Sequence, residues 1–125
     1  MKDNTDIKKG DIFYVNLGKE KNGHIQNGGH GGVRPCIIVN NNVACLYSPV
    51  LLVVPISSSA ARVMRKFPTH LVLEGTLKKK SVALFEQILT VNRSQLRGKI
   101  ATLPDNLMQS ADEMLKVAFG LPRTA

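Results

Sequence analysis

The sequence contains no tryptophan, and aromatic residues make up only 5% of it. Hydrophobic residues still make up 43%, so the core must consist mostly of valine, isoleucine and leucine. A chain of 125 residues ordinarily forms one domain, and it can bury about two-thirds of its unfolded surface. This composition argues against a disordered chain and indicates one small globular domain.

Long apolar runs are also missing. No run approaches the roughly 20 residues of a membrane-spanning helix, and the polar residues 1–10 lack the apolar core of a signal peptide. Cysteine is scarce, and Cys36 and Cys45 both lie in or beside apolar segments. We therefore expect a cytoplasmic protein without a membrane partner, and two buried, reduced thiols rather than a disulfide or a metal site.

Acidic residues are few, at 9 Asp and Glu against 17 Lys and Arg, which gives a net charge of +8 and a pI near 9.8. Between Arg62 and Lys99 there are nine basic residues and only two acidic ones. A local excess of this kind favours a polyanion, and nucleic acid in particular, over a basic surface kept for solubility. A membrane surface is disfavoured because no basic amphipathic helix is evident.

Common enzyme motifs are absent as well. The sequence has no CxxC, HExxH or Walker loop, and the three histidines lack metal-ligand spacing, so we expect neither a metal nor a cofactor. His70 lies in a predicted strand, which favours a structural role. His24 and His30 lie in a glycine-rich stretch, residues 18–32, where ligand contact and simple solvation are equally compatible with the pattern.

The chain reads mainly as short apolar segments separated by turn residues. These segments predict strands over residues 10–17, 35–40, 50–56, 69–73, 81–84, 86–91 and 99–103, and residues 43–47 are expected to extend the sheet edge. The pattern favours a mainly β (α+β) fold, a small twisted antiparallel sheet or open barrel.

Helices are fewer. A short helix is expected over residues 60–66, and Asn92 is expected to cap a helical turn that ends at Gly98. Residues 104–119 give the clearest helix, with Pro104 at its first position and Gly120 as its stop. Its apolar positions recur at helical spacing, so we expect it to pack on the sheet.

Two polar residues at strand ends are candidates for chemistry. Arg34 precedes Pro35, so its backbone is biased to the extended form at the junction between a loop and a strand. Its guanidinium suits phosphate, and the Ser57 hydroxyl can donate to a phosphoryl oxygen. Taken alone, the same residues also fit a surface salt bridge for Arg34 and a helix cap for Ser57.

Six motifs in order resemble the MazF/PemK (Kid) toxin family. They are GDIFY at 10–14, GGVRP at 31–35, YSP at 47–49 with PISS at 55–58, FPTH at 67–70, SVALFEQI at 81–88 and AFGL at 118–121. The resemblance spans residues 10–121, which we take as the domain, with residues 1–9 as a flexible arm and 122–125 as a short tail.

The resemblance implies a compact SH3-like barrel with a C-terminal helix (CcdB/PemK-like). It also implies a homodimeric, metal-independent endoribonuclease toxin that cuts single-stranded RNA to 2′,3′-cyclic phosphate and 5′-hydroxyl ends. A cognate antitoxin would inhibit it, and DNA would be contacted only through the toxin–antitoxin complex. The family's catalytic arginine falls on Arg34 and its catalytic threonine or serine on Ser57.

We further expect contacts with the RNA from Lys19, His30, Ser58, Lys80, Ser81 and Gln87. Residues 18–32 replace a shorter family segment that helps select the RNA sequence, so the cleavage motif is not set by the resemblance. Two other classes stay open: a non-catalytic toxin of the same fold acting on a topoisomerase, and a plain RNA-binding barrel.

Overall fold

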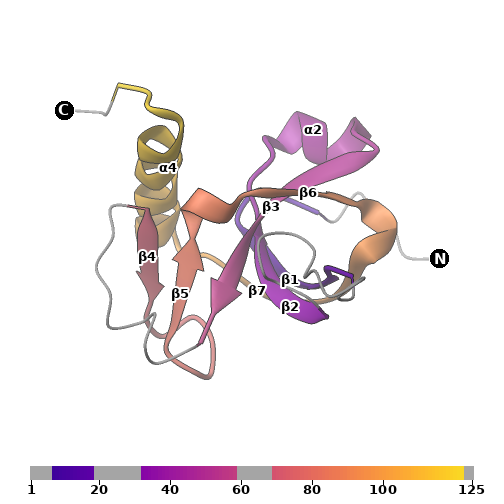
Figure 1. Ribbon diagram of the computed structural model, residues 1–125, viewed down its shortest axis with the longest axis horizontal. Helices are drawn as coiled ribbons and strands as arrows, with labels where there is room; N and C mark the ends of the chain where they lie inside the picture. Colours follow the sequence, from indigo (N-terminus) through magenta and orange to yellow (C-terminus); the bar gives the residue numbers. More distant parts are fainter. Residues whose placement is uncertain (1–6, 19–31, 59–68, 123–125) are drawn as a thin grey trace, which may run out of the picture.

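The computed structural model describes residues 7–18, 32–58 and 69–122. Its strands form one antiparallel sheet in the order β4-β5-β3-β2-β1-β7, and β6 pairs with β3 beside this path (Figure 1). In chain order the elements are β1 (Asp11–Asn16), β2 (Val33–Ile38), helix α2 (Asn42–Tyr47), β3 (Val50–Ser57), β4 (His70–Leu73), β5 (Ser81–Leu84), 3-10 helix η2 (Phe85–Gln87), β6 (Leu89–Asn92), 3-10 helix η3 (Arg93–Gln95), β7 (Leu96–Thr102) and helix α4 (Asp105–Phe119). The mainly β, antiparallel architecture with a C-terminal helix is as the sequence predicted.

Strand β3 connects the part of the sheet formed by β2, β1 and β7 with the part formed by β5 and β4. Its first four residues pair with β6, its middle pairs with β2, and its last two residues pair with β5. The apolar run of β3 is explained by this position, because most of its residues are buried on one face of the sheet or the other.

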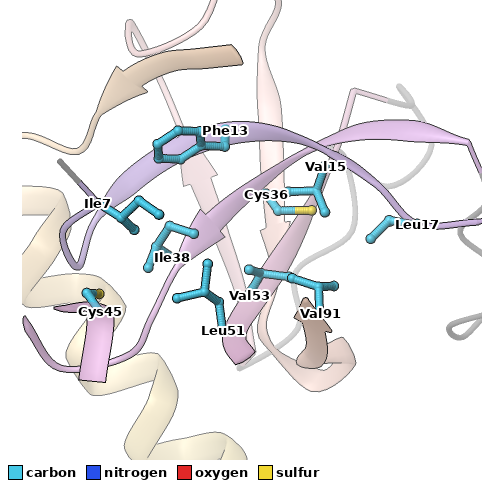
Figure 2. Close-up of a cluster of buried hydrophobic side chains, with 10 residues drawn as sticks. All are labelled: Ile7, Phe13, Val15, Leu17, Cys36, Ile38, Cys45, Leu51, Val53 and Val91. Carbon is cyan, nitrogen blue, oxygen red and sulfur yellow. The ribbon is translucent and has the colours of Figure 1, made fainter. Parts of the chain in front are cut away.

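Side chains alternate between two cores on opposite faces of β1, β2 and β3. Phe13 and Cys36 belong to the first core, which β6 also supplies with Val91 (Figure 2). Ile12 and Ile37 belong to the second core, which α4 covers with Ala111. The first core also includes Ile7, so residue 7 is packed rather than part of the expected arm.

Helix α4 confirms the helix predicted over residues 104–119, with one shift. Pro104 is the residue before the helix rather than its first position. Gly120 adopts a left-handed conformation with φ 69°, and its N–H donates to the carbonyls of Lys116 and Val117, which ends the helix. Met108 of α4 packs closely against Gly10, which precedes β1. A Cβ added at Gly10 would collide with Sδ of Met108.

Three local predictions were wrong. Residues 43–47 form helix α2 instead of extending the sheet, because the Asn41 side chain caps the helix by accepting a hydrogen bond from the Ala44 N–H at 2.8 Å. Residues 86–91 divide into η2 and β6, and β7 starts at Leu96, before Gly98. The expected helix over 60–66 lies outside the described residues, and no helix within them is long and apolar enough to cross a membrane.

Candidate active site

Three strand ends meet at one end of the sheet. Strand β2 begins there, β3 ends there and β5 begins there, because β3 is antiparallel to both neighbours. Ser57 pairs with Val82, so the next residues outward on the two strands are Ser58 and Ser81. Four of the predicted site residues therefore gather at this end: Arg34, Ser57, Ser58 and Ser81, with Lys80 adjoining.

Arg34 lies within β2 rather than before it, since the strand starts at Val33. Its cross-strand partner on β1 is Val15, which is fully buried, whereas Arg34 itself is exposed. The Arg34 carbonyl accepts a hydrogen bond from the Cys36 thiol at 3.7 Å. The guanidinium is thus carried by a regular strand whose neighbours are fixed in a core, which limits movement of its backbone.

The position of Ser57 on β3 corresponds to that of Arg34 on β2. The β2–β3 ladder ends with the pair Cys36 and Pro55, and Pro55 has no N–H to donate. Arg34 and Ser57 each lie two residues beyond this last pair, Arg34 on β2 and Ser57 on β3. Beyond the last pair, β2 stays paired with β1 and β3 pairs with β5.

The face of the sheet to which each of the two residues belongs is related to the last pair of the ladder. Arg34 is two residues from Cys36 on β2, and Cys36 belongs to the first core. Ser57 is two residues from Pro55, the residue that lies opposite Cys36. By the alternation of side chains along a strand, Arg34 shares the face of Cys36 and Ser57 shares the face of Pro55.

The basic and hydroxyl groups beside this pair differ in accessibility. Ser57 is half-buried, and Ser58 and Lys80 are exposed, together with Lys78 and Lys79. Ser81 is buried, and its hydroxyl donates to the Lys79 carbonyl at 2.9 Å. The expected RNA contact by Ser81 is therefore not supported, because its hydroxyl proton stabilises the turn that presents the lysines.

The remaining predicted contacts are not gathered at this end. Gln87 lies in η2, beyond the opposite end of β5, and its Nε2 donates to Glu86 Oε2 at 3.5 Å. Lys19 and His30 lie outside the described residues. Gln87 is consequently separated from the Arg34 and Ser57 pair by the length of a strand.

A polar cluster that the sequence did not predict lies near Gln87. Glu86 accepts hydrogen bonds from Thr69 Oγ1 at 2.9 Å and lies 3.0 Å from His70 Nε2. Burial raises the pKa of the Glu86 carboxyl, but hydrogen bonds from His70, its own backbone and Thr69 outweigh burial, so the pKa lies below its ordinary value. The buried His70 side chain fits the predicted structural role. No spacing in the sequence connects residues 69 and 86, and only the β4–β5 pairing brings them together.

The two thiols are buried, as predicted, and they are free cysteines. Burial raises the pKa of Cys36 to about 12 and also raises the pKa of Cys45. Neither thiol is ionised near neutral pH, so neither is a nucleophile there. Within residues 7–18, 32–58 and 69–122, no three His, Cys, Asp or Glu side chains are grouped to hold a metal ion.

Known proteins share both the sequence pattern and the fold. Residues 8–119 match the family described as PemK-like, MazF-like toxin of type II toxin-antitoxin system. "Endoribonuclease EndoA" of Bacillus subtilis (strain 168) is 30% identical over 118 residues, which cover 92% of this chain and 96% of that protein.

Solved structures agree at lower identity. A mycobacterial endoribonuclease in complex with its cognate antitoxin superposes with a TM-score of 0.76 at 19% identity, covering 94% of this chain and 99% of the other. MazF from Deinococcus radiodurans gives a TM-score of 0.72 at 17% identity, covering 92% and 97% of the two chains. These structures support the fold, and the match over residues 8–119 establishes the family. The chain therefore belongs to the PemK-like, MazF-like toxins of type II toxin–antitoxin systems.

Proposed function

We propose that this chain is a sequence-specific endoribonuclease toxin that cuts single-stranded RNA, mRNA in particular. The observation that carries the proposal is the antiparallel β2–β3 pairing, in which the start of β2, with Arg34, and the end of β3, with Ser57, lie at one end of the sheet. Family membership and the 30% identity to a protein named as an endoribonuclease support it.

The chemistry we propose is an internal transesterification. The ribose 2′-oxygen attacks the adjacent phosphorus, and the bond from phosphorus to the 5′-oxygen of the next nucleotide breaks. The 2′-hydroxyl loses its proton, the leaving 5′-oxygen gains one, and the products are a 2′,3′-cyclic phosphate and a 5′-hydroxyl. The nucleophile is part of the substrate and already close to the phosphorus, so no metal is needed to position it.

Arg34 has the chemistry to stabilise the phosphorane. Its fork of donors matches two phosphoryl oxygens and carries a permanent positive charge. Ser57 would donate one further hydrogen bond to the same phosphate. Donors fixed before the reaction are effective because they need not reorganise as charge develops, and β2 and β3 supply that rigidity.

The exposed lysines next to the pair fit the RNA backbone. Lys78, Lys79 and Lys80 lie in the turn before β5, close to Ser58 at the end of β3. We propose that Lys80 and Ser58 contact the RNA. Lys19, His30 and Gln87 keep their proposed roles in RNA contact, with His30 as an additional proton carrier near neutral pH.

The partners we propose are a cognate antitoxin and a second copy of the chain. An acidic antitoxin segment would compete with RNA for the basic surface around Lys80, because both are polyanions. DNA would be reached only through the toxin–antitoxin complex, and the proposed location is the cytoplasm.

The test is incubation of the purified protein with a long single-stranded RNA, followed by mapping of the cut ends. We expect cuts at a short sequence that leave cyclic phosphate and 5′-hydroxyl ends, persist in EDTA and vanish when the cut site carries a 2′-deoxyribose. Arg34→Ala should lower the cleavage rate by about 100- to 1000-fold. Cleavage by Arg34→Ala at the wild-type rate would overturn the assignment of the site.

The same assay, together with RNA-binding and topoisomerase assays, separates the two rival classes. RNA binding without cleavage by the wild-type protein would identify a plain RNA-binding barrel. Inhibition of a topoisomerase with no effect on RNA would identify a non-catalytic toxin of the same fold.

A further inference from the structure

Gln95, the last residue of η3, makes two hydrogen bonds with the two ends of its side-chain amide. Its Oε1 accepts from the Asn92 N–H at 2.8 Å, which completes a capping box on η3. Its Nε2 donates to the Asn16 carbonyl at 2.7 Å, across 79 residues of sequence. The first bond serves η3 itself, whereas the second joins η3 to the end of β1.

The bond from Gln95 to Asn16 extends the β1–β7 ladder, with a side-chain amide in place of a backbone N–H. Strand β7 pairs with β1 only as far as Val15 and Leu96. One residue further, β1 reaches Asn16, while the chain on the β7 side has turned into η3. At this point the Gln95 amide supplies the donor that a further strand residue would have supplied, so the Asn16 carbonyl has a partner beyond the end of β7.

Asn16 is also the last residue of β1, and we call this end of the β1–β2 hairpin, which carries Arg34, the hairpin foot. It lies opposite Val33, the residue before Arg34, and its Oδ1 accepts from the Gly18 N–H at 3.0 Å. Gly32 N–H donates to the Gly18 carbonyl at 2.6 Å. The Gln95 bond therefore holds β1 from the side opposite β2, directly behind the first residues of β2.

We propose that Gln95 is a positioning residue for RNA cleavage, acting through Asn16 on the strand that presents Arg34. The inference rests on the proposed function. Loss of the tether removes the hydrogen bond that holds the Asn16 carbonyl on the side away from β2, so the hairpin foot gains freedom and Arg34 loses its fixed placement at the start of β2. Misplacement by about 1 Å can lower a rate by about 100-fold, so a residue that does not touch RNA can govern kcat.

Two substitutions of Gln95 distinguish its bond to the Asn16 carbonyl, the tether, from its bond to the Asn92 N–H, the cap. Gln95→Glu keeps an oxygen for the Asn92 N–H but replaces the donor with a negative charge facing the Asn16 carbonyl. Gln95→Lys keeps a donor for Asn16 but removes the oxygen that caps η3. We expect Gln95→Glu to lower kcat by about 10- to 100-fold with KM little changed, and Gln95→Lys to retain kcat within about threefold of wild type.

A second readout does not depend on cleavage. Hydrogen exchange at the Gly18 and Gly32 amides reports on the hairpin foot, and we expect it to speed up in Gln95→Glu but not in Gln95→Lys. The proposal is overturned if Gln95→Glu leaves kcat unchanged, if exchange at the two glycines stays at the wild-type rate, or if Gln95→Lys is as slow as Gln95→Glu. A wild-type protein that fails to cut RNA would instead refute the proposed function, and the exchange measurement would still test the tether.

Discussion

Arg34 and Ser57 lie equally far beyond the last pair of the β2–β3 ladder, Cys36 and Pro55. By the alternation of side chains along a strand, Arg34 shares the face of Cys36, a residue of the first core, and Ser57 shares the face of Pro55. The pairing partners then differ, because β2 continues beside β1 and β3 beside β5. In the proposed mechanism, both side chains contact one phosphate between these strand ends.

This arrangement predicts non-additive losses of activity. Arg34→Ala and Ser57→Ala should each lower kcat by about 100- to 1000-fold, since each removes a preorganised donor. If both donors stabilise the same transition state, the double variant should lose less than the product of the two single losses. Single-turnover cleavage of one RNA by all four proteins measures this.

Two control variants test whether the losses are specific to Arg34 and Ser57. Ser57→Thr retains the hydroxyl and should stay within about tenfold of wild type. Lys116→Ala removes a cation from α4, which covers the second core on the other face of the sheet, and should leave kcat unchanged. Independent, multiplicative losses from Arg34→Ala and Ser57→Ala would show that the two side chains do not act on one phosphate.

A second prediction concerns the contact between Gly10 and α4. Gly10 has φ of 92°, and a Cβ there would collide with Sδ of Met108. Gly10→Ala should therefore destabilise the fold by about 1–3 kcal/mol, through backbone strain and overpacking. Urea unfolding followed by circular dichroism measures the loss.

The double variant Gly10→Ala with Met108→Ala divides that loss into its two causes. Removing the Met108 side chain relieves the collision but leaves the strained φ, so the added Cβ should cost less in the Met108→Ala background than in wild type. An equal cost in both backgrounds would show that the collision contributes nothing.

The sequence predicted most strands and the C-terminal helix because their signals are local. The apolar run of β3 and the helical spacing of residues 104–119 depend only on neighbours in the chain. Arg34 and Ser57 were likewise identified from motifs. Their relative placement could not be predicted, because it follows from strand register, which is a property of paired strands.

A helix cap and long-range hydrogen bonds account for features that the sequence analysis missed. Residues 43–47 are a short apolar run, yet they form α2, which Asn41 caps and the distant Arg93 supports. Gln95 carried no local signal beyond a polar turn. Its bond to Asn16 spans 79 residues, so only the folded chain reveals it.

Arg93 provides a third prediction. Its Nε donates to the Ser48 carbonyl at 2.7 Å, and its Nη2 donates to the carbonyls of Ala44 at 3.3 Å and of Cys45. The carbonyls of Cys45 and Ser48, at the end of α2, would otherwise lack a helical partner, whereas the Ala44 carbonyl also accepts from the Ser48 N–H at 2.8 Å. Arg93→Met should therefore destabilise the protein by about 2–3 kcal/mol, measured by thermal or urea unfolding.

Arg97→Met is the matched control for that substitution. Arg97 is exposed and donates only to the nearby carbonyls of Ser94 and Leu96. We expect its loss to change the free energy of unfolding by less than about 0.5 kcal/mol. Equal effects of the two substitutions would indicate that α2 does not need the Arg93 cap.

The fourth prediction is a pH dependence carried by Glu86. The hydrogen bonds to this carboxylate, from His70, Thr69 and the backbone, hold its pKa below the ordinary value of 4.5. A carboxyl with a lowered folded-state pKa stabilises the fold above its unfolded-state pKa, and that contribution is lost as the pH falls through the folded-state pKa. We therefore expect the advantage of wild type over Glu86→Gln to be constant near neutrality and to disappear below pH 4.5.

The size of that advantage is limited by solvent. The Glu86 side chain is 40% exposed, so screening should keep its contribution below about 1 kcal/mol. Melting curves of wild type, Glu86→Gln and the exposed control Glu74→Gln between pH 7 and pH 3 provide the measurement. A Glu86→Gln difference that stays constant down to pH 3, or one that Glu74→Gln reproduces, would mean that the bonds from Thr69 and His70 do not favour the ionised carboxylate.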